Sequence, residues 1–286
     1  MKTSQSQYIT IRGLRYHVRS WGAPTSPRLF MLHGWMDVSA SFQFLVDALP
    51  SHWDVFAPDW RGYGLSDWGK SDCYWFPDYL ADLDALLEHI SPQAPIDLVG
   101  HSLGGNVACL YAGVRPARIR RLVNLEGFGM PATQPEQAPG RYARWLDELG
   151  ERKGFRPYAD FAALAERMQQ NNPRLTRERA EFLARHWGRE MADGQVALRG
   201  EARYVARLAR WSPELPPEPR ALIRAGEQPF RLESDRPGIL DHLRVRGADQ
   251  GLPLHDPLRE EEIQGLSERL GPGGPIPLLR PSREEP

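Results

Sequence analysis

A short glycine-flanked turn between two apolar segments constrains this chain more than any other feature. Gly100-His101-Ser102-Leu103-Gly104 has the form G-x-S-x-G, follows the strand-like run Ile96–Val99 and precedes a helix-like stretch, Gly105–Val114. Such a turn forces its central residue into a strained backbone conformation, and the glycines let strand and helix approach without side-chain clashes. Ser102 then stands clear of the sheet at a helix N-terminus, whose field stabilises negative charge. The pattern predicts a nucleophilic serine, against the simpler alternative of a helix-capping serine.

Apolar runs of strand length alternate with segments of helical period over the first half of the chain. Expected strands are Tyr8–Arg12, Leu14–Trp21, Leu29–Leu32, Trp53–Ala57, Ile96–Val99 and Leu122–Leu125. Expected helices are Ser41–Leu49, Gly105–Val114 and Phe76–Ile90, the last with its acidic residues on the face opposite the apolar ones. This alternation indicates an α/β fold with a mainly parallel sheet flanked by helices.

The pattern changes between residues 131 and 211, where charged and apolar residues recur at helical spacing. Helices are expected at Tyr142–Leu149, Phe161–Met168 and Arg177–His186, and no strand is expected. We interpret residues 131–211 as a helical cap inserted into a core made of residues 1–130 and 212–286. The alternative is a peripheral bundle with no role in binding.

The segment 212–286 differs in composition from the rest of that core. It contains one aromatic residue, Phe230, no lysine and 13 of the chain's 26 prolines. A segment with so few large apolar side chains buries a core less well. We therefore expect residues 212–286 to be atypical for the fold and poorly ordered.

Charge and cysteine content exclude several classes of protein. Lys and Arg number 36 against 37 Asp and Glu, so the chain lacks the basic field of a nucleic-acid binder. The two cysteines, Cys73 and Cys109, lack metal-site spacing, and Cys109 is expected to be a buried thiol. With no signal-peptide run and no membrane-spanning segment, we expect a cytoplasmic protein without disulfides, metal or organic cofactor.

A second glycine turn, Leu32-His33-Gly34-Trp35, directly follows an apolar strand. Acyl transfer places negative charge on the former carbonyl oxygen, and two backbone N–H groups usually stabilise it. The candidate donors for this oxyanion hole are the amides of Trp35 and Leu103. We expect the His33 ring to connect neighbouring loops rather than to take part in chemistry.

Three motifs in this order, His33-Gly34-Trp35, Asp59–Ser66 and Gly100–Gly105, resemble the α/β-hydrolase superfamily over roughly residues 8–130. The chain looks most like its capped esterase-type members and the serine hydrolase-like proteins. The resemblance implies that Ser102 is the nucleophile and that Asp59–Ser66 is a structural loop at the border of the site. Haloalkane dehalogenases and epoxide hydrolases of this superfamily use an aspartate nucleophile, so a serine argues against both chemistries.

A serine nucleophile needs a histidine to take its proton and a carboxylate to orient that histidine. In this fold the acid and then the histidine follow the nucleophile along the chain. Glu126, at the end of the strand Leu122–Leu125, is the preferred acid. Glu227, which follows Ala221–Gly226, and Asp235 are the alternatives.

The catalytic histidine should follow the acid, near the end of the chain. Gly251–Pro257 is similar to the region where the family carries its catalytic Gly-His pair, but a leucine stands where the histidine is expected. His255 is the nearest substitute, and His186 and His242 are the other histidines after the nucleophile region. Without a histidine at Ser102 we expect the rate to fall on the order of a millionfold.

The candidate nucleophile, acid, histidine and oxyanion hole together predict hydrolysis of a carboxylic ester or related acyl compound through an acyl-serine intermediate. The alternatives are a carbon–carbon bond hydrolase, lactonase or thioesterase with the same triad, or a hydrolase-like protein that binds without turnover. An apolar acyl or aromatic substrate is indicated by aromatic residues that border the site by motif position, although core packing explains each equally well. These residues are Trp35, Trp60, Tyr63, Trp68, Tyr74 and Trp75.

Overall fold

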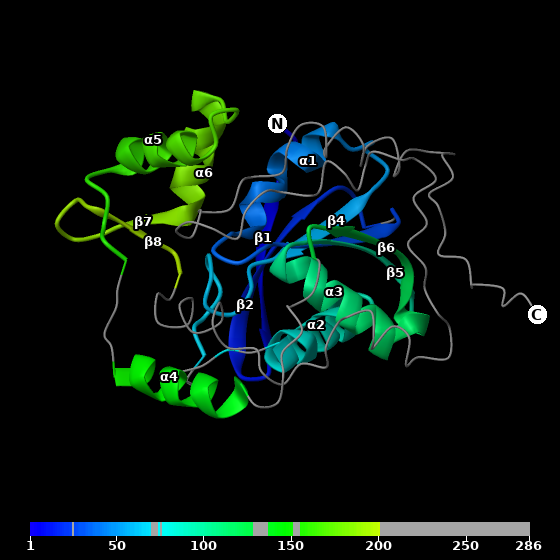
Figure 1. Ribbon diagram of the computed structural model, residues 1–286. Helices are drawn as coiled ribbons and strands as arrows, with labels where there is room; N and C mark the ends of the chain where they lie inside the picture. The colour runs from blue at the N-terminus through cyan, green and yellow to red at the C-terminus, as the bar shows by residue number, and fades with distance from the viewer. Residues whose placement is uncertain (25, 70–73, 75, 128–136, 151–154, 201–286) are drawn as a thin grey trace, which may run out of the picture.

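The structure is a computed structural model that describes residues 1–24, 26–69, 74, 76–127, 137–150 and 155–200 (Figure 1). Several sequence-based expectations fall outside these described residues and stay predictions. They concern the segment 212–286 and the side chains of Cys73, Trp75, Glu227, Asp235, His242 and His255.

A six-stranded sheet forms the centre of the described structure, with strand order β1-β2-β4-β3-β5-β6. The strands are β1 (Gln5–Ile11), β2 (Leu14–Trp21), β3 (Arg28–Leu32), β4 (Asp54–Pro58), β5 (Ile96–His101) and β6 (Ile119–Leu125). β2 pairs antiparallel with β1 and with β4, whereas the pairs β4–β3, β3–β5 and β5–β6 are parallel. The mainly parallel sheet predicted from sequence is therefore confirmed.

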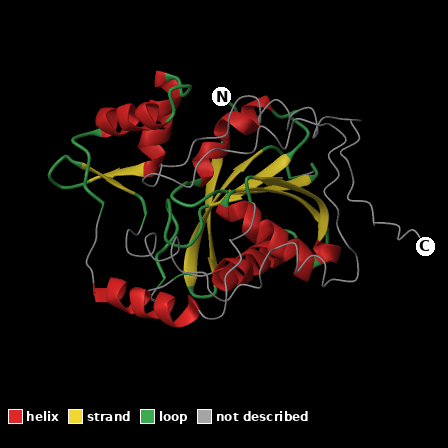
Figure 2. Ribbon diagram, viewed as in Figure 1, coloured by secondary structure: helices red, strands yellow, loops and turns green. Residues whose placement is uncertain are grey.

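Helices cover both faces of the sheet (Figure 2). α2 (Phe76–Ile90) and α3 (Leu103–Val114) lie on one face, and the short helix η1 (Ser39–Phe42) continues into α1 (Gln43–Ala48) on the other. α2 buries its apolar stripe against the sheet, with Tyr79, Leu83 and Leu87 all fully buried. Burial of each such side chain stabilises the fold by roughly 1.5–3 kcal/mol.

One acidic residue of α2 does not follow the expected amphipathic pattern. Asp82 has 0% of its surface exposed, although the acidic residues of this helix were expected on the outer face. That expectation was wrong for Asp82 because cationic and hydroxyl groups from other elements meet its carboxylate inside the protein.

The described part of residues 131–211 contains the three predicted helices, α4 (Ala138–Gly150), α5 (Phe161–Asn171) and α6 (Arg177–Trp187). Asp160 and Thr176 cap the N-termini of α5 and α6 with their side-chain oxygens. The expectation of no strand here was wrong, because β7 (Gly188–Glu190) and β8 (Val196–Leu198) form an antiparallel hairpin. Gly194, with φ of +81°, supplies the left-handed turn that such a short hairpin needs.

The four parallel strands end at the same edge of the sheet, and each is followed at once by a residue singled out from sequence. His33 follows β3, Asp59 follows β4, Ser102 follows β5 and Glu126 follows β6. In open α/β sheets, ligands bind outside the carboxyl ends of the strands. The fold therefore brings these four positions, spread over 94 positions of sequence, to the edge where a site is expected.

Candidate active site

Ser102 occupies a strained turn between β5 and α3. Its backbone has φ of +49° and ψ of −114°, a region that a non-glycine residue rarely adopts and that costs about 1–3 kcal/mol. Two backbone hydrogen bonds hold the turn: the Ser102 amide donates to the Leu125 carbonyl at 2.7 Å, and the Asn106 amide donates to the Ser102 carbonyl at 3.0 Å. The strand–turn–helix context predicted for this serine is confirmed.

The glycines around Ser102 are required by close backbone packing. A Cβ atom at Gly100 would lie 2.4 Å from the Gly104 carbonyl oxygen, and one at Gly104 would lie 2.2 Å from the Leu32 carbonyl oxygen. Real side chains do not tolerate such distances to backbone atoms. The beginning of α3 can approach β3 and β5 this closely only because both positions are glycine.

The loop that follows β3 lies directly against Ser102. A Cβ atom at Gly34 would be 3.2 Å from the Ser102 Cβ and 3.0 Å from the His101 Nδ1. This contact brings the predicted oxyanion-hole loop next to the serine across 68 positions of sequence. The amides of Trp35 and Leu103 stay candidate donors, with Leu103 buried at the first position of α3.

His33 connects two loops, as expected from sequence. Its Nδ1 lies 2.7 Å from the Gly34 carbonyl oxygen, and its Nε2 accepts a hydrogen bond from the Trp60 amide at 2.9 Å. This pair of contacts places the ring proton on Nδ1. Burial lowers the pKa of His33, so the ring is neutral at pH 7. The Trp60 indole also donates to the His33 carbonyl oxygen at 3.0 Å, which completes the connection.

The loop Asp59–Ser66 is organised by the carboxylate of Asp59. This side chain accepts hydrogen bonds from the amides of Ser39 at 2.6 Å and Leu65 at 2.9 Å, and lies 2.8 Å from the Nδ1 of His17. Burial by itself would raise the pKa of Asp59, but the hydrogen bond and charge of His17 hold it well below its usual range. Asp59 is therefore a structural anion, in agreement with the role implied for this loop.

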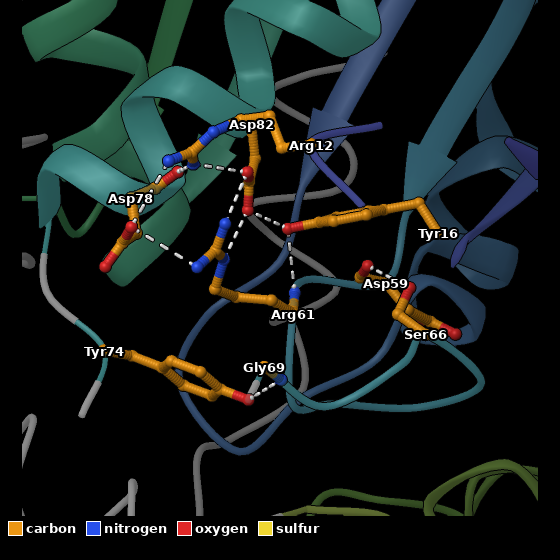
Figure 3. A network of polar contacts seen from close by, with 9 residues as sticks. All are labelled: Arg12, Tyr16, Asp59, Arg61, Ser66, Gly69, Tyr74, Asp78 and Asp82. Carbon is orange, nitrogen blue, oxygen red and sulfur yellow. Dashed lines mark hydrogen bonds and ion pairs between the residues drawn. The ribbon is translucent and has the colours of Figure 1, made fainter. Parts of the chain in front are cut away.

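Arg61 anchors the same loop to α2 through a buried ion pair (Figure 3). Its Nε and Nη2 donate to the two carboxylate oxygens of Asp82 at 2.5 and 2.6 Å. Arg12 donates to the same carboxylate at 2.7 Å, and the Tyr16 hydroxyl also donates to it while accepting from the Arg61 amide. The network joins the β1–β2 turn, the loop after β4 and α2, so the loop cannot shift independently of the core.

Three of the aromatic side chains expected around the site are instead part of the hydrophobic core. Trp60, Tyr63 and Tyr74 are each at most 2% exposed, and Trp60 packs edge-on against Tyr79 of α2. Core packing, the alternative explanation from sequence, accounts for their contacts. Trp35 is partly buried and Trp68 is 43% exposed.

Glu126 stands beside the nucleophile turn at the end of β6. Its φ of +59° is again unusual for a non-glycine residue, and its side chain is 27% exposed. Asn124 fixes this backbone by accepting from the Gly127 amide at 2.8 Å and donating to the Gly127 carbonyl oxygen at 2.6 Å. The Glu126 Oε2 lies 3.7 Å from the Nε2 of His101. Sequence reasoning did not identify Asn124 as the residue that positions Glu126.

His186, one of the alternatives for the catalytic base, lies in another part of the molecule. Its Nδ1 is 3.4 Å from the Arg19 Nη2 on β2, and its ring packs against Phe182. β2 is separated from β5 by β4 and β3 in the sheet. Burial, followed by the charge of Arg19, lowers the pKa of His186 to about 4. The structure therefore does not place His186 beside Ser102.

A second series of serine, histidine and aspartate side chains was not foreseen. The His17 Nε2 lies 2.9 Å from the Ser6 Oγ, and its Nδ1 faces Asp59. His17 is fully buried and Ser6 is exposed on the edge strand β1. Because a histidine contacts a serine here as well, any assay of serine reactivity must separate Ser6 from Ser102.

Cys109 is a buried thiol, as expected. Burial raises its pKa to about 11, and Asn124 donates a hydrogen bond to its Sγ at 3.1 Å. Among the described residues, no group of three His, Cys, Asp or Glu side chains is arranged to hold a metal ion. No helix in this part of the chain has the length and apolar character needed to cross a membrane.

The chain is similar in sequence to a known protein family and to several named proteins. The sequence profile of the alpha/beta hydrolase fold family matches residues 27–208. A Danio rerio protein named serine hydrolase-like protein is 30% identical over 63% of this chain and 56% of its own length. Serine hydrolase-like protein 2 of Homo sapiens is 24% identical over 64% of this chain and 60% of its own. The matches span little more than half of these relatives.

Solved structures share the fold over a larger part of the chain. A thioesterase domain from the curacin biosynthetic pathway has a TM-score of 0.70 at 25% identity, covering 79% of this chain and 80% of that domain. A hypothetical protein of Pseudomonas aeruginosa PAO1 has a TM-score of 0.68 at 25% identity, covering 78% of each chain.

Proposed function

Because the chain belongs to the alpha/beta hydrolase fold family, we propose that it is a serine hydrolase that cleaves a carboxylic ester or related acyl compound. The observation that carries the proposal is the position of Ser102. It lies in a strained strand-to-helix turn, with the Gly34 loop packed directly against it. A helix-capping serine needs neither the strain nor the second loop, whereas a nucleophile with an oxyanion hole needs both.

In the proposed reaction, the Ser102 Oγ attacks the carbonyl carbon while a histidine takes the hydroxyl proton. The amides of Trp35 and Leu103 stabilise the oxyanion of the tetrahedral intermediate. The protonated histidine then gives its proton to the departing alcohol, which leaves an acyl-serine. Water, deprotonated by the same histidine, attacks the acyl group and releases the acid and the free serine.

His255 is proposed as the histidine and Glu126 as the acid that orients it. Glu126 is supported by its place directly after β6, with its backbone fixed next to the nucleophile turn. His255 rests on the sequence alone. We further propose that residues 131–211 cap the site, because the Gly64 amide of the border loop donates to the Arg199 carbonyl oxygen at 3.0 Å.

Labelling with a fluorophosphonate probe tests the activated serine without knowledge of the substrate. Wild-type protein is expected to label, Ser102→Ala to lose the label, and His255→Gln to lose it with unchanged thermal unfolding. Ser6→Ala is the matched control and is expected to label like the wild type. A well-folded wild type that does not label contradicts the proposal and favours a hydrolase-like binding protein.

A thioesterase is the second candidate, supported by the thioesterase domain of the curacin pathway that shares the fold at 25% identity. Its reaction uses the same groups but releases a thiol. Comparison of kcat/KM for matched oxygen and thiol esters of one acyl chain distinguishes the two. The ester proposal expects the oxygen ester to be preferred.

A further inference from the structure

Among the described residues, no carboxylate forms an ion pair with the buried guanidinium of Arg19 on β2. Only 8% of its surface is exposed. Its Nη1 donates to the Ser4 Oγ at 2.8 Å and its Nη2 lies 3.4 Å from the His186 Nδ1, so both described partners are neutral acceptors. Its Nε is buried and, within the ranges that the structure describes, has no hydrogen-bond partner. Buried charges are normally paired, so this guanidinium needs an explanation.

A second guanidinium, that of Arg199, acts on His186 together with Arg19: the charges of both lower the pKa of the imidazole. Arg199 follows β8 and donates from Nε to the Gly188 carbonyl oxygen at 2.8 Å. Burial lowers its pKa, and the electrostatic neighbours that act on it include Asp59, Arg189 and Tyr8. Within the described part of the chain, neither Arg19 nor Arg199 forms an ion pair with a carboxylate.

Asp59 is the one described carboxylate that acts on both arginines, and its oxygens are already engaged. They accept hydrogen bonds from two backbone amides and face the His17 ring. The charge of Asp59 acts on both arginines, but none of its hydrogen bonds to described residues is to Arg19 or Arg199. Among the described residues around Arg19, cations therefore outnumber anions, and the Arg19 Nε is an unused N–H donor.

We propose that Arg19, Arg199 and His186 form a binding site for a small oxyanion, of the carboxylate or phosphate class. A guanidinium fork matches the oxygens of such an anion. Because the His186 Nδ1 faces a donor, the ring proton belongs on Nε2, which supplies a further donor. His186, Arg199 and Ser4 are partly exposed, so solvent and small ions reach the side chains around Arg19.

This site is separate from the proposed reaction at Ser102 and goes beyond it. Arg19 lies on β2, and β4 and β3 stand between that strand and β5. Loss of labelling at Ser102 would leave the oxyanion site unaffected, and Ser102→Ala is expected to bind the oxyanion like the wild type.

The test is titration of the full-length protein with inorganic phosphate and, separately, with acetate, followed by NMR of the His186 imidazole. A bound anion favours the imidazolium form, so the pKa of His186 is expected to rise above its value in chloride alone. Arg19→Met is expected to weaken the apparent affinity by at least about tenfold. Arg177→Met, which removes an exposed arginine paired with Glu181, is the matched control and is expected to bind normally.

Thermal unfolding gives a second readout, because an anion that binds only the folded state raises Tm. Phosphate or acetate is expected to raise the Tm of wild type but not of Arg19→Met. If Arg19→Met does not fold, Arg199→Met replaces it. An unchanged His186 resonance at about 50 mM of either anion would overturn the proposal. An equal rise in the His186 pKa and in Tm with chloride would also overturn it, because it would indicate charge screening. Equal rises with phosphate or acetate in wild type and in the arginine variants would overturn it as well.

Discussion

At Gly34 the absence of a single methyl group decides how closely one loop approaches another. The Cβ of an alanine here would lie 3.0 to 3.4 Å from the His101 ring and the Ser102 Cβ, closer than side chains normally pack. Neither neighbour can easily move, because His101 ends a buried strand and Ser102 lies in the strained turn. The loop that carries the Trp35 amide must therefore shift instead.

Gly34→Ala is expected to slow fluorophosphonate labelling of Ser102 on the order of 100-fold, since loss of one oxyanion donor has an effect of this size. The measurement is the second-order labelling rate, together with Tm. Gly140→Ala is the matched control, because a Cβ there meets nothing within 4 Å. Equal rates for the two variants would show that the Gly34 loop does not position a donor.

At the scale of elements, a buried ion pair joins the loop Asp59–Ser66 to α2. The Asp82 carboxylate is fully buried and receives donors from Arg61, Arg12 and Tyr16. Removal of one partner of a buried pair leaves the other charge uncompensated, which is far more costly than loss of an exposed pair. The loop carries Trp60, whose bonds hold His33, so the ion pair also supports the loop beside Ser102.

Asp82→Asn is expected to lower the free energy of unfolding by about 3–5 kcal/mol. Glu181→Gln, which breaks the exposed pair with Arg177 on α6, is expected to lower it by less than about 1 kcal/mol. Urea denaturation of both variants beside the wild type measures the difference. Similar midpoints for the two variants would contradict the role assigned to the buried pair.

At the scale of the whole molecule, two histidines from distant elements make stability depend on pH in the same direction. His33 follows β3 and His186 lies on α6, and burial lowers the pKa of both, that of His186 from 6.5 to about 4. Below pH 6.5 the unfolded chain binds protons that the folded protein does not. The free energy of unfolding therefore falls as the pH falls from 6.5 towards 4.

The free energy of unfolding is expected to fall by at most about 1.4 kcal/mol per pH unit for each histidine. Urea denaturation at about pH 7.5 and about pH 5, in buffers without carboxylate or phosphate, measures it. His186→Gln is expected to reduce the change in the free energy of unfolding with pH, and the contribution of His33 to that change is expected to remain. Equal stability of the wild type at the two pH values would exclude this linkage.

The sequence by itself determined the features that local chemistry dictates. Apolar runs of period two and apolar stripes of helical period located β1 to β6 and α1 to α6, because side-chain direction repeats with backbone geometry. The G-x-S-x-G pattern located the turn at Ser102, because only glycine permits the close approach at Gly100 and Gly104. The hairpin β7–β8 was missed because three-residue strands carry too little periodic signal.

Only the tertiary structure decided what depends on contacts between distant segments. Asp82 is buried because its partners include Arg12, 70 positions away, and no local pattern reveals that partner. The same reason applies to His186, which the fold places beside Arg19, 167 positions away in the sequence, rather than beside Ser102. Periodicity shows that a face is apolar, but which charges meet inside a protein is set by how its elements pack.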